Sequence, residues 1–222
     1  DLVVVLDMDE CLVSCPRSQA ESDAKVKVDF MHVQIHEKRC PTRILLRPHV
    51  ISFLKEVTSR YETYIFTAAT QGFADPVIDG LCKLINDPYA FDGRYYFQDC
   101  QKIKNTRNGV VTLTKPLLKT IGGLIDNDID ILRRIVHIDD QHLNYIQNWE
   151  NGIPVPEFKG DPNDDALKDV LKLLRTLDNK DVDVRSILVE KYKHLDVFKS
   201  GKKIPAFTCM KNQRYASNLK QQ

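Results

Sequence analysis

Three short apolar runs of this chain each end in polar side chains of a kind that phosphate chemistry uses. The runs and their polar residues are Val3–Leu6 with Asp7 and Asp9, Tyr64–Phe66 with Thr67, and Ile135–Ile138 with Asp139 and Asp140. Open α/β sheets bind ligands outside the carboxyl ends of their strands, so polar groups placed there converge on one crevice. The pattern therefore predicts one site at one edge of a sheet, and a phosphoryl group held with Mg²⁺ is the leading hypothesis for its ligand.

Composition excludes several other classes of protein. The 222 residues suffice for one domain with one core plus a tail or insertion. With 32 basic and 31 acidic residues, the net charge of +1 favours neither nucleic acid nor a membrane surface as a partner. Six cysteines without a CxxC pair argue against a disulfide framework or a zinc site, and favour a nuclear or cytoplasmic location. No apolar run is long enough to span a bilayer. Because the first strand begins at residue 2, we expect the chain to be trimmed upstream.

Strand and helix patterns alternate along most of the chain. The opening run lacks alternation, as expected of a strand buried on both faces in a parallel sheet. The other predicted elements are a helix from Pro48 through Val57, a strand over Glu62–Phe66, a helix around Val77–Ile85, a short helix over Leu117–Leu124, a strand over Arg134–Ile138 and an amphipathic helix over Asp164–Leu177. We expect an α/β fold with a Rossmann-like, mostly parallel central sheet flanked by helices.

Two segments have the pattern of antiparallel strands instead. Residues 25–46 contain two strand-like runs separated by a turn-rich gap, which predicts an antiparallel pair. Within 91–114, Asn108-Gly109 stands between strand-like runs and is a strong hairpin signal, so we expect a small antiparallel β insertion there. The segment 191–222 is basic, and we expect it to be peripheral and partly flexible.

Asp7 and Asp9 have the spacing that a two-step phosphoryl transfer needs. One carboxylate can attack phosphorus and become an aspartyl phosphate, while the other donates a proton to the leaving oxygen and later takes one from water. Taken alone, the pair is better explained by two acids that cap a turn. A calcium loop does not explain it, because Cys11 and Leu12 occupy positions where that loop needs Asp and Gly.

The candidate residues elsewhere in the chain each have a structural alternative. The hydroxyl of Thr67 and the backbone N–H groups beside it, including that of Ala68, are suited to phosphate oxygens, whereas a helix N-cap is the common role of such a Thr. Asp139 and Asp140 offer oxygen ligands to Mg²⁺, or form a turn. Lys115 is suited to neutralising a phosphoryl group, although most lysines are solvated.

Five motifs in this order give the chain a family resemblance. They are Asp7-Met8-Asp9-Glu10-Cys11-Leu12-Val13, Leu46-Arg47-Pro48-His49, Phe66-Thr67-Ala68, Ala74-Asp75-Pro76 and Ile138-Asp139-Asp140. The chain resembles the haloacid dehalogenase superfamily, and specifically its NLI-interacting-factor-like branch of small phosphatases that act on the C-terminal domain of RNA polymerase II. The resemblance runs from residue 2 to about residue 178, and implies a phosphatase domain over 1–190.

The resemblance also implies a role for each candidate residue. Asp7 would be the nucleophile and Asp9 the general acid and base. Thr67 and Lys115 would hold the phosphoryl group. Mg²⁺ would be bound by the Asp7 carboxylate, the Asp9 backbone carbonyl and one of the pair Asp139 and Asp140.

The chain departs from the branch at several positions. Cys11 replaces a Thr, Asp140 stands where the branch has Asn, and Gln141-His142 replaces Ser-Pro. An added carboxylate next to Mg²⁺ is expected to change metal affinity or the pH optimum more than the reaction type. The insertion reads Phe97-Gln98-Asp99-Cys100 where relatives carry an Arg that helps to recognise a phosphorylated peptide, so the resemblance is least informative about the substrate. For Cys11 near Cys15, a redox switch and an inert buried thiol are the two interpretations.

The leading hypothesis is a Mg²⁺-dependent serine/threonine phosphatase that acts as a monomer on a phosphorylated protein segment such as the polymerase C-terminal domain, with no direct contact to nucleic acid. A phosphatase of a membrane-associated regulator of lipid synthesis is an alternative among enzymes. A phosphopeptide-binding scaffold without turnover is the alternative outside them.

Overall fold

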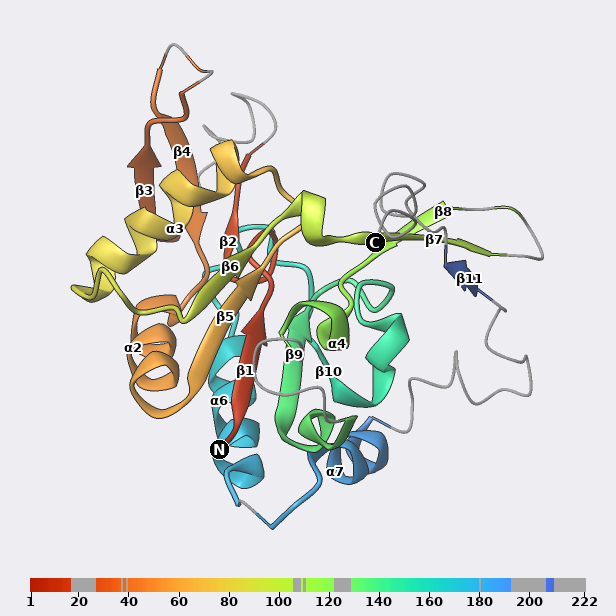
Figure 1. Cartoon of the computed structure of the whole chain (residues 1–222). Coiled ribbons are helices and arrows are strands. Elements are labelled where there is room, and N and C mark those ends of the chain that lie inside the picture. Colours follow the sequence, from red (N-terminus) through yellow and green to blue (C-terminus); the bar gives the residue numbers. More distant parts are fainter. Residues whose placement is uncertain are drawn as a thin grey trace.

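The computed structural model describes residues 1–222 with the exception of 17–26, 37, 39, 106–108, 110, 122–128, 180, 193–206 and 210–222. Its centre is a parallel sheet of five strands in the order β10-β9-β1-β5-β6 (Figure 1). The strands are β1 (Val3–Leu6), β5 (Glu62–Phe66), β6 (Gly93–Tyr95), β9 (Ile135–Asp139) and β10 (Gly152–Pro154). The predicted α/β fold with a parallel central sheet is confirmed.

Alternate residues of the strands pack on the two faces of this sheet. On one face, Val4 and Leu6 of β1 belong to a large core with α2 (Val50–Arg60), α3 (Gln71–Ile85), α6 (Ala166–Leu177) and α7 (Val184–Lys191). On the other, Val3 and Val5 belong to a smaller core with α4 (Leu117–Thr120). Because side chains alternate along a strand, the next residue on the α4 side is Asp7.

Two antiparallel sheets flank the central one. Strands β2 (Val13–Ser14), β4 (Thr42–Leu46) and β3 (Phe30–Val33) form the first, and β11 (Phe207–Cys209), β7 (Gln101–Asn105) and β8 (Val111–Thr114) form the second. In Figure 1 the β7–β8 hairpin projects to the right of the central sheet. The hairpin predicted around Asn108-Gly109 is present, although most of its turn lies outside the described residues.

The segment predicted as one insertion, 91–114, is divided between two sheets. Its first strand, β6, pairs in parallel with β5 and forms an edge of the central sheet, so only the part from β7 onward is an antiparallel hairpin. The pattern of the sequence did not distinguish the two parts, because a three-residue strand carries no periodicity. Likewise β3 begins at Phe30, so Val28 of the predicted alternation precedes the strand, and Val26 lies outside the described residues. Of the segment 191–222, the structure describes Lys191, Tyr192 and β11, which pairs with β7, and the expected mobility stays a prediction.

Some predicted helix limits also differ from the structure. α2 begins at Val50 rather than at Pro48, because His49 is the N-cap and has a left-handed backbone with φ of 68°. α4 ends at Thr120, and residues 122–124 of the predicted helix lie outside the described residues. α6 begins at Ala166 rather than at Asp164, whose carboxylate accepts the Ala166 N–H at 2.9 Å. Short 3-10 helices occupy Phe97–Asp99, Ile129–Arg134 and Ile146–Asn151.

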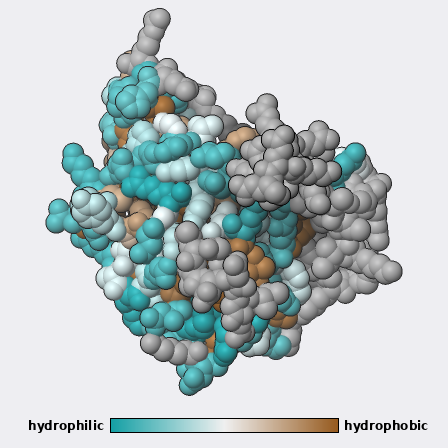
Figure 2. Space-filling model, in the orientation of Figure 1, coloured by the Kyte–Doolittle hydropathy of each residue, from teal (hydrophilic) through white to brown (hydrophobic). Residues whose placement is uncertain are grey.

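The surface in the view of Figure 2 is mostly hydrophilic, with hydrophobic patches between hydrophilic areas. Among the helices of the described residues, none is both long and apolar enough to cross a membrane.

Candidate active site

The register of the central sheet places Asp7 beside Asp139. Leu6 of β1 is paired with Ile138 of β9, and the N–H of Asp7 donates to the Ile138 carbonyl at 2.9 Å. Both carboxylates follow the strand positions that face α4. Both are buried, with Asp7 5% and Asp139 0% exposed. Two neighbouring carboxylates without contact to water need a cation or a proton to balance them.

Lys115 supplies one positive charge between these two carboxylates. It follows β8 and precedes α4, and its side chain is only 1% exposed. Its Nζ donates to Oδ1 of Asp7 at 2.5 Å and to Oδ2 of Asp139 at 2.6 Å. The alternative of a solvated lysine is therefore wrong.

The pKa values of these groups follow from burial and from their mutual charges. Burial and the Asp139 carboxylate raise the pKa of Asp7 well above its usual range, against the opposing effect of Lys115. Burial alone would raise the pKa of Asp139 too, but the Lys115 ammonium and His137 hold it well below its usual range. Burial would lower the pKa of Lys115, yet the Asp139 and Asp7 carboxylates raise it. Lys115 is thus charged.

Asp9 and Thr67 meet above the ends of β1 and β5. Thr67 Oγ1 donates to Oδ2 of Asp9 at 3.2 Å and accepts the N–H of Ala69 at 3.0 Å. The N-cap of α3 is Thr70, so Thr67 does not have the capping role that was its structural alternative. Burial raises the pKa of Asp9, partly offset by the Thr67 hydrogen bond. A carboxyl group with a raised pKa retains its proton closer to neutral pH, which is what a general acid needs.

Asp7, Asp139 and Asp140 fit a divalent cation. One carboxylate oxygen from each of the three lies within 4.8 Å of the other two. Hard oxygen ligands of this kind suit Mg²⁺, which commonly keeps several waters besides one or two carboxylates. Asp140 is half-buried, and burial raises its pKa. When all three carboxylates are ionised, Lys115 balances only one of their negative charges, so the cluster would favour a bound cation.

All seven predicted residues thus lie at one edge of the central sheet, around the ends of β1, β5 and β9. Ala68 is exposed next to buried Thr67. This shared location is the one that the three strand ends predicted. The roles assigned to the individual residues stay predictions.

The structure adds two residues whose contributions the sequence did not indicate. Arg47 is buried and donates from Nη1 to the Cys11 carbonyl at 3.0 Å and from Nη2 to the Pro156 carbonyl at 2.8 Å. It also forms a bidentate pair with Asp164, at 3.0 and 2.7 Å. Arg47 thereby ties the loop after β1, which carries Asp9, to the start of α6. The second residue, Asn144, contacts Asp139 through its amide. In the sequence, Arg47 was singled out only by the motif Leu46-Arg47-Pro48-His49, and no motif included Asn144.

Cys11 has the environment of an inert thiol. It is fully buried, its Sγ lies 3.9 Å from the Ile138 carbonyl, and burial together with Asp7 raises its pKa well above the usual range. A thiol that stays protonated reacts slowly with oxidants. Burial raises the pKa of Cys15 as well. These environments favour the inert interpretation over the redox switch.

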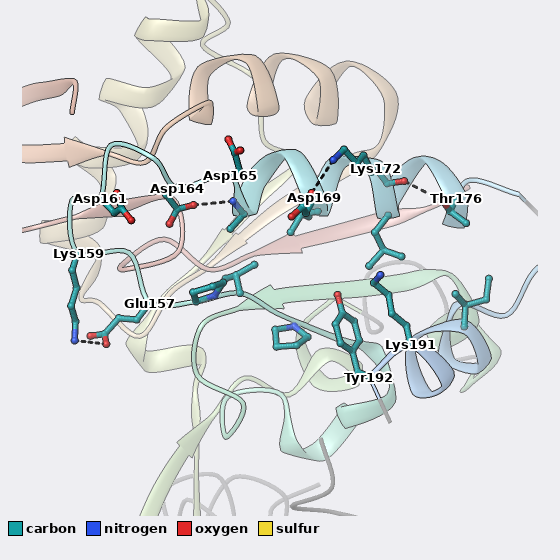
Figure 3. Close-up of a pocket in the computed structure, with 17 residues that line it drawn as sticks. Glu157, Lys159, Asp161, Asp164, Asp165, Asp169, Lys172, Thr176, Lys191 and Tyr192 are labelled. Atoms are coloured by element: carbon teal, nitrogen blue, oxygen red, sulfur yellow. Dashed lines mark hydrogen bonds and ion pairs between the residues drawn. The ribbon is translucent and has the colours of Figure 1, made fainter. Parts of the chain in front are cut away.

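A separate groove of about 940 Å³ lies between α6, α7 and the segment after β10 (Figure 3). Four of its charged side chains pair with one another, and Asp164 and Asp165 pair with Arg47 and Lys168 outside it. Glu157 accepts from Lys159 at 2.6 Å and Asp169 from Lys172 at 3.0 Å. The groove therefore shows no convergent set of unpaired reactive groups, unlike the cluster around Asp7.

Comparison with known proteins agrees with this site. A model of the NLI interacting factor-like phosphatase family matches residues 2–185. The chain is 32% identical over 200 residues to Nuclear envelope morphology protein 1 of Saccharomyces cerevisiae, covering 85% of this chain and 42% of that protein. It is 29% identical over 190 residues to the human Carboxy-terminal domain RNA polymerase II polypeptide A small phosphatase 1, covering 84% of this chain and 63% of that protein.

The chain thus spans less than two thirds of the length of either relative. A solved structure of Fcp1, an essential RNA polymerase II CTD phosphatase, has a TM-score of 0.48 and 21% identity, and the match covers 92% of this chain and 55% of that one. The match of the family model extends over most of the chain, from β1 to the start of α7, and includes every candidate site residue. This chain belongs to the NLI interacting factor-like phosphatase family.

Proposed function

We propose that this chain is a Mg²⁺-dependent phosphatase that removes phosphate from serine or threonine in a protein segment. The observation that carries the proposal is the arrangement of Asp7, held by Lys115, beside Asp9, held by Thr67. The Lys115 ammonium fixes the Asp7 carboxylate in place, and the raised pKa of Asp9 is what a general acid requires.

The first step forms an aspartyl phosphate. An oxygen of the Asp7 carboxylate attacks phosphorus, the bond from phosphorus to the serine or threonine oxygen breaks, and Asp9 gives its proton to that oxygen. In the second step a water attacks the phosphorus of the aspartyl phosphate. Asp9 takes the proton of this water, and the Asp7 carboxylate leaves with its bonding pair.

The surrounding residues provide charge and orientation in both steps. Lys115 offsets the negative charge that gathers on the phosphoryl oxygens. Thr67 holds Asp9, and the backbone beside it at Ala68 is available to phosphate oxygens. Asp7, Asp139 and Asp140 are the side chains that would hold Mg²⁺, together with the Asp9 carbonyl that the family resemblance implies. When bound, Mg²⁺ would supply positive charge to the phosphoryl oxygens.

The names of the relatives support a protein substrate. The human relative is named as a small phosphatase of the RNA polymerase II C-terminal domain, so a phosphorylated segment of that kind is the substrate we propose. The yeast relative is named for nuclear envelope morphology and has the higher identity, 32% against 29%. A regulator at a membrane is therefore the second candidate substrate. Either fits the proposed nuclear or cytoplasmic location of a monomer.

The test compares hydrolysis of p-nitrophenyl phosphate and a phosphoserine peptide by the wild type, Asp7→Asn and Asp169→Asn, with and without Mg²⁺. Asp169 is exposed on α6 and serves as the matched control. We expect Mg²⁺-dependent turnover by the wild type and the control, and none by Asp7→Asn. An acid-quenched reaction should contain phosphoprotein that hydroxylamine cleaves. Full activity of Asp7→Asn would refute the nucleophile, and a folded wild type that binds the peptide without turnover would favour the scaffold.

A further inference from the structure

Asn144 makes five hydrogen bonds, and through them it connects Asp139 to the segment that carries Lys115. Its Nδ2 donates to Oδ1 of Asp139 at 2.8 Å and to Oδ2 at 3.1 Å. Its carbonyl accepts the N–H of Lys115 at 2.6 Å and the hydroxyl of Thr114 at 2.8 Å. Its own N–H donates to the Gln141 carbonyl at 2.9 Å. One residue thus contacts the strand end that carries a proposed metal ligand and the segment that carries the cation.

The loop that carries Asn144 has a fixed position. The next residue, Tyr145, is fully buried, and its ring packs against Gly152 at the start of β10, where a Cβ would overlap the ring. Tyr145 also packs edge-on against His137, with ring centroids 5.8 Å apart. The contacts of the Tyr145 ring with Gly152 and His137 hold the loop in place, and Asn144 with it. The Asn144 amide therefore meets Asp139 without a large further loss of conformational entropy on folding.

The side-chain amide of Asn144 restrains rotation of the Asp139 carboxylate, which the other contacts of Asp139 permit. Oδ2 accepts from Lys115 at 2.6 Å and lies 3.4 Å from His137 Nε2, and Oδ1 accepts the N–H of Gln141 at 2.8 Å. The terminal torsion of an aspartate is broad, so its carboxylate rotates readily between neighbouring donors. A donor that bridges both oxygens fixes the plane of the group. Without the Asn144 amide, the Asp139 carboxylate would rotate toward the Lys115 ammonium and draw that ammonium away from Asp7.

We propose that Asn144 is a positioning residue, which acts on the reaction by fixing the Asp139 carboxylate and through it the place of Lys115 between Asp139 and Asp7. This inference rests on the proposed function for its kinetic consequence. Partners of this kind behind a metal ligand commonly affect metal affinity or activity by about 10- to 100-fold. The backbone contacts of Asn144 survive substitution, so a side-chain variant removes the amide alone.

The experiment compares Asn144→Ala with Asn148→Ala, a control in the 3-10 helix that follows the loop. Asn148 donates its backbone N–H to Tyr145 at 2.9 Å, a contact that the substitution keeps. For Asn144→Ala we expect Mg²⁺ affinity by calorimetry to fall about 10-fold and kcat about 10- to 100-fold, with KM within about twofold of the wild type. Asn148→Ala should match the wild type in all three. Asn144→Ser, which retains one donor, should recover part of kcat.

Equal Mg²⁺ affinity and equal kcat in Asn144→Ala and the wild type would overturn the proposal. A loss of thermal stability alone, with both quantities unchanged, would assign Asn144 a purely structural role and also overturn it. Crystal structures of the two proteins give a result that depends on neither turnover nor metal binding. We expect the Asp139 carboxylate to rotate in Asn144→Ala, and an unchanged orientation contradicts the inference. A wild type without phosphatase activity would refute the proposed function and leave this structural comparison valid.

Discussion

Replacement of Lys115 by Met should destabilise the protein in a way that depends on pH. Met keeps much of the aliphatic volume of Lys and removes the ammonium that lies 2.5 Å from Asp7 and 2.6 Å from Asp139. The two carboxylates then remain buried with no cation from the chain between them. Oxygens of Asp7 and Asp139 lie within 4.8 Å of each other. Two unit charges at that distance repel by about 3.5 kcal/mol at an effective dielectric constant of about 20.

The expected loss of stability in Lys115→Met at pH 8, in the absence of divalent cations, is therefore about 3 kcal/mol. For a chain of this size, that corresponds to a fall in melting temperature of about 6–12 °C. A group whose folded pKa is raised makes its full contribution to stability below its unfolded pKa, and that contribution is lost as pH rises through the folded pKa. Asp7 is such a group, and the variant raises its pKa further. At pH 5 the variant therefore takes up a proton at Asp7, and its deficit relative to the wild type should shrink.

The assay is urea denaturation of the wild type, Lys115→Met and Lys119→Met at pH 8 and pH 5, with EDTA present. Lys119 is exposed on α4, so Lys119→Met controls for the loss of a lysine from the same segment. Its stability should stay within about 0.5 kcal/mol of the wild type at both pH values. The reasoning is refuted if Lys115→Met is as stable as Lys119→Met at pH 8, or if its deficit is the same at both pH values.

Three further predictions concern other parts of the site. Asp9→Asn should lower kcat by about 10²- to 10⁴-fold on a phosphoserine peptide and by less on p-nitrophenyl phosphate, whose leaving group needs little protonation; equal losses on both substrates contradict the general acid. Asp140→Asn should weaken Mg²⁺ binding in calorimetry by removing one of three clustered carboxylates, and unchanged affinity excludes Asp140 as a ligand. Arg47→Met should cost about 3–5 kcal/mol in urea denaturation because it leaves the Asp164 carboxylate without its cation, whereas the exposed Arg60→Met should stay close to the wild type in stability.

The central sheet and the place of the site follow from local patterns in the sequence. β1 and β9 are short apolar runs without alternation, and a run of this kind predicts a strand that is buried on both faces. Each of these runs ends where the chain leaves the sheet, so the residue types at the ends were enough to predict a shared edge. The limits of β5 are those that its own sequence indicated, Glu62–Phe66.

The contacts that complete the site join residues far apart in the sequence and have no local pattern. Arg47 and Asp164 are 117 positions apart, and in the sequence one of them has a place in a motif and the other a place at the start of a predicted helix. Asn144 stands in a loop between two predicted elements, where an Asn is common for reasons of turn geometry alone. The register of β1 against β9 and the packing of Tyr145 bring Asp139 and Asn144 to the candidate catalytic residues.

The charges of the site also lower the stability of the folded chain. Asp7 and Asp139 are buried beside one lysine, and Asp140 adds a third carboxylate to the same cluster. Because burial raises the pKa of Asp7, its ionised form opposes folding at neutral pH, while the proposed attack on phosphorus requires that form. A divalent cation would favour the ionised carboxylates that the reaction needs. Because it would bind the folded chain and not the unfolded one, it would also stabilise the fold. Mg²⁺ should therefore raise the melting temperature of the wild type more at pH 8 than at pH 5, because at pH 5 protons compete for the same oxygens. Asp7→Asn should show a smaller rise at pH 8, and an equal rise in both proteins would place the cation elsewhere.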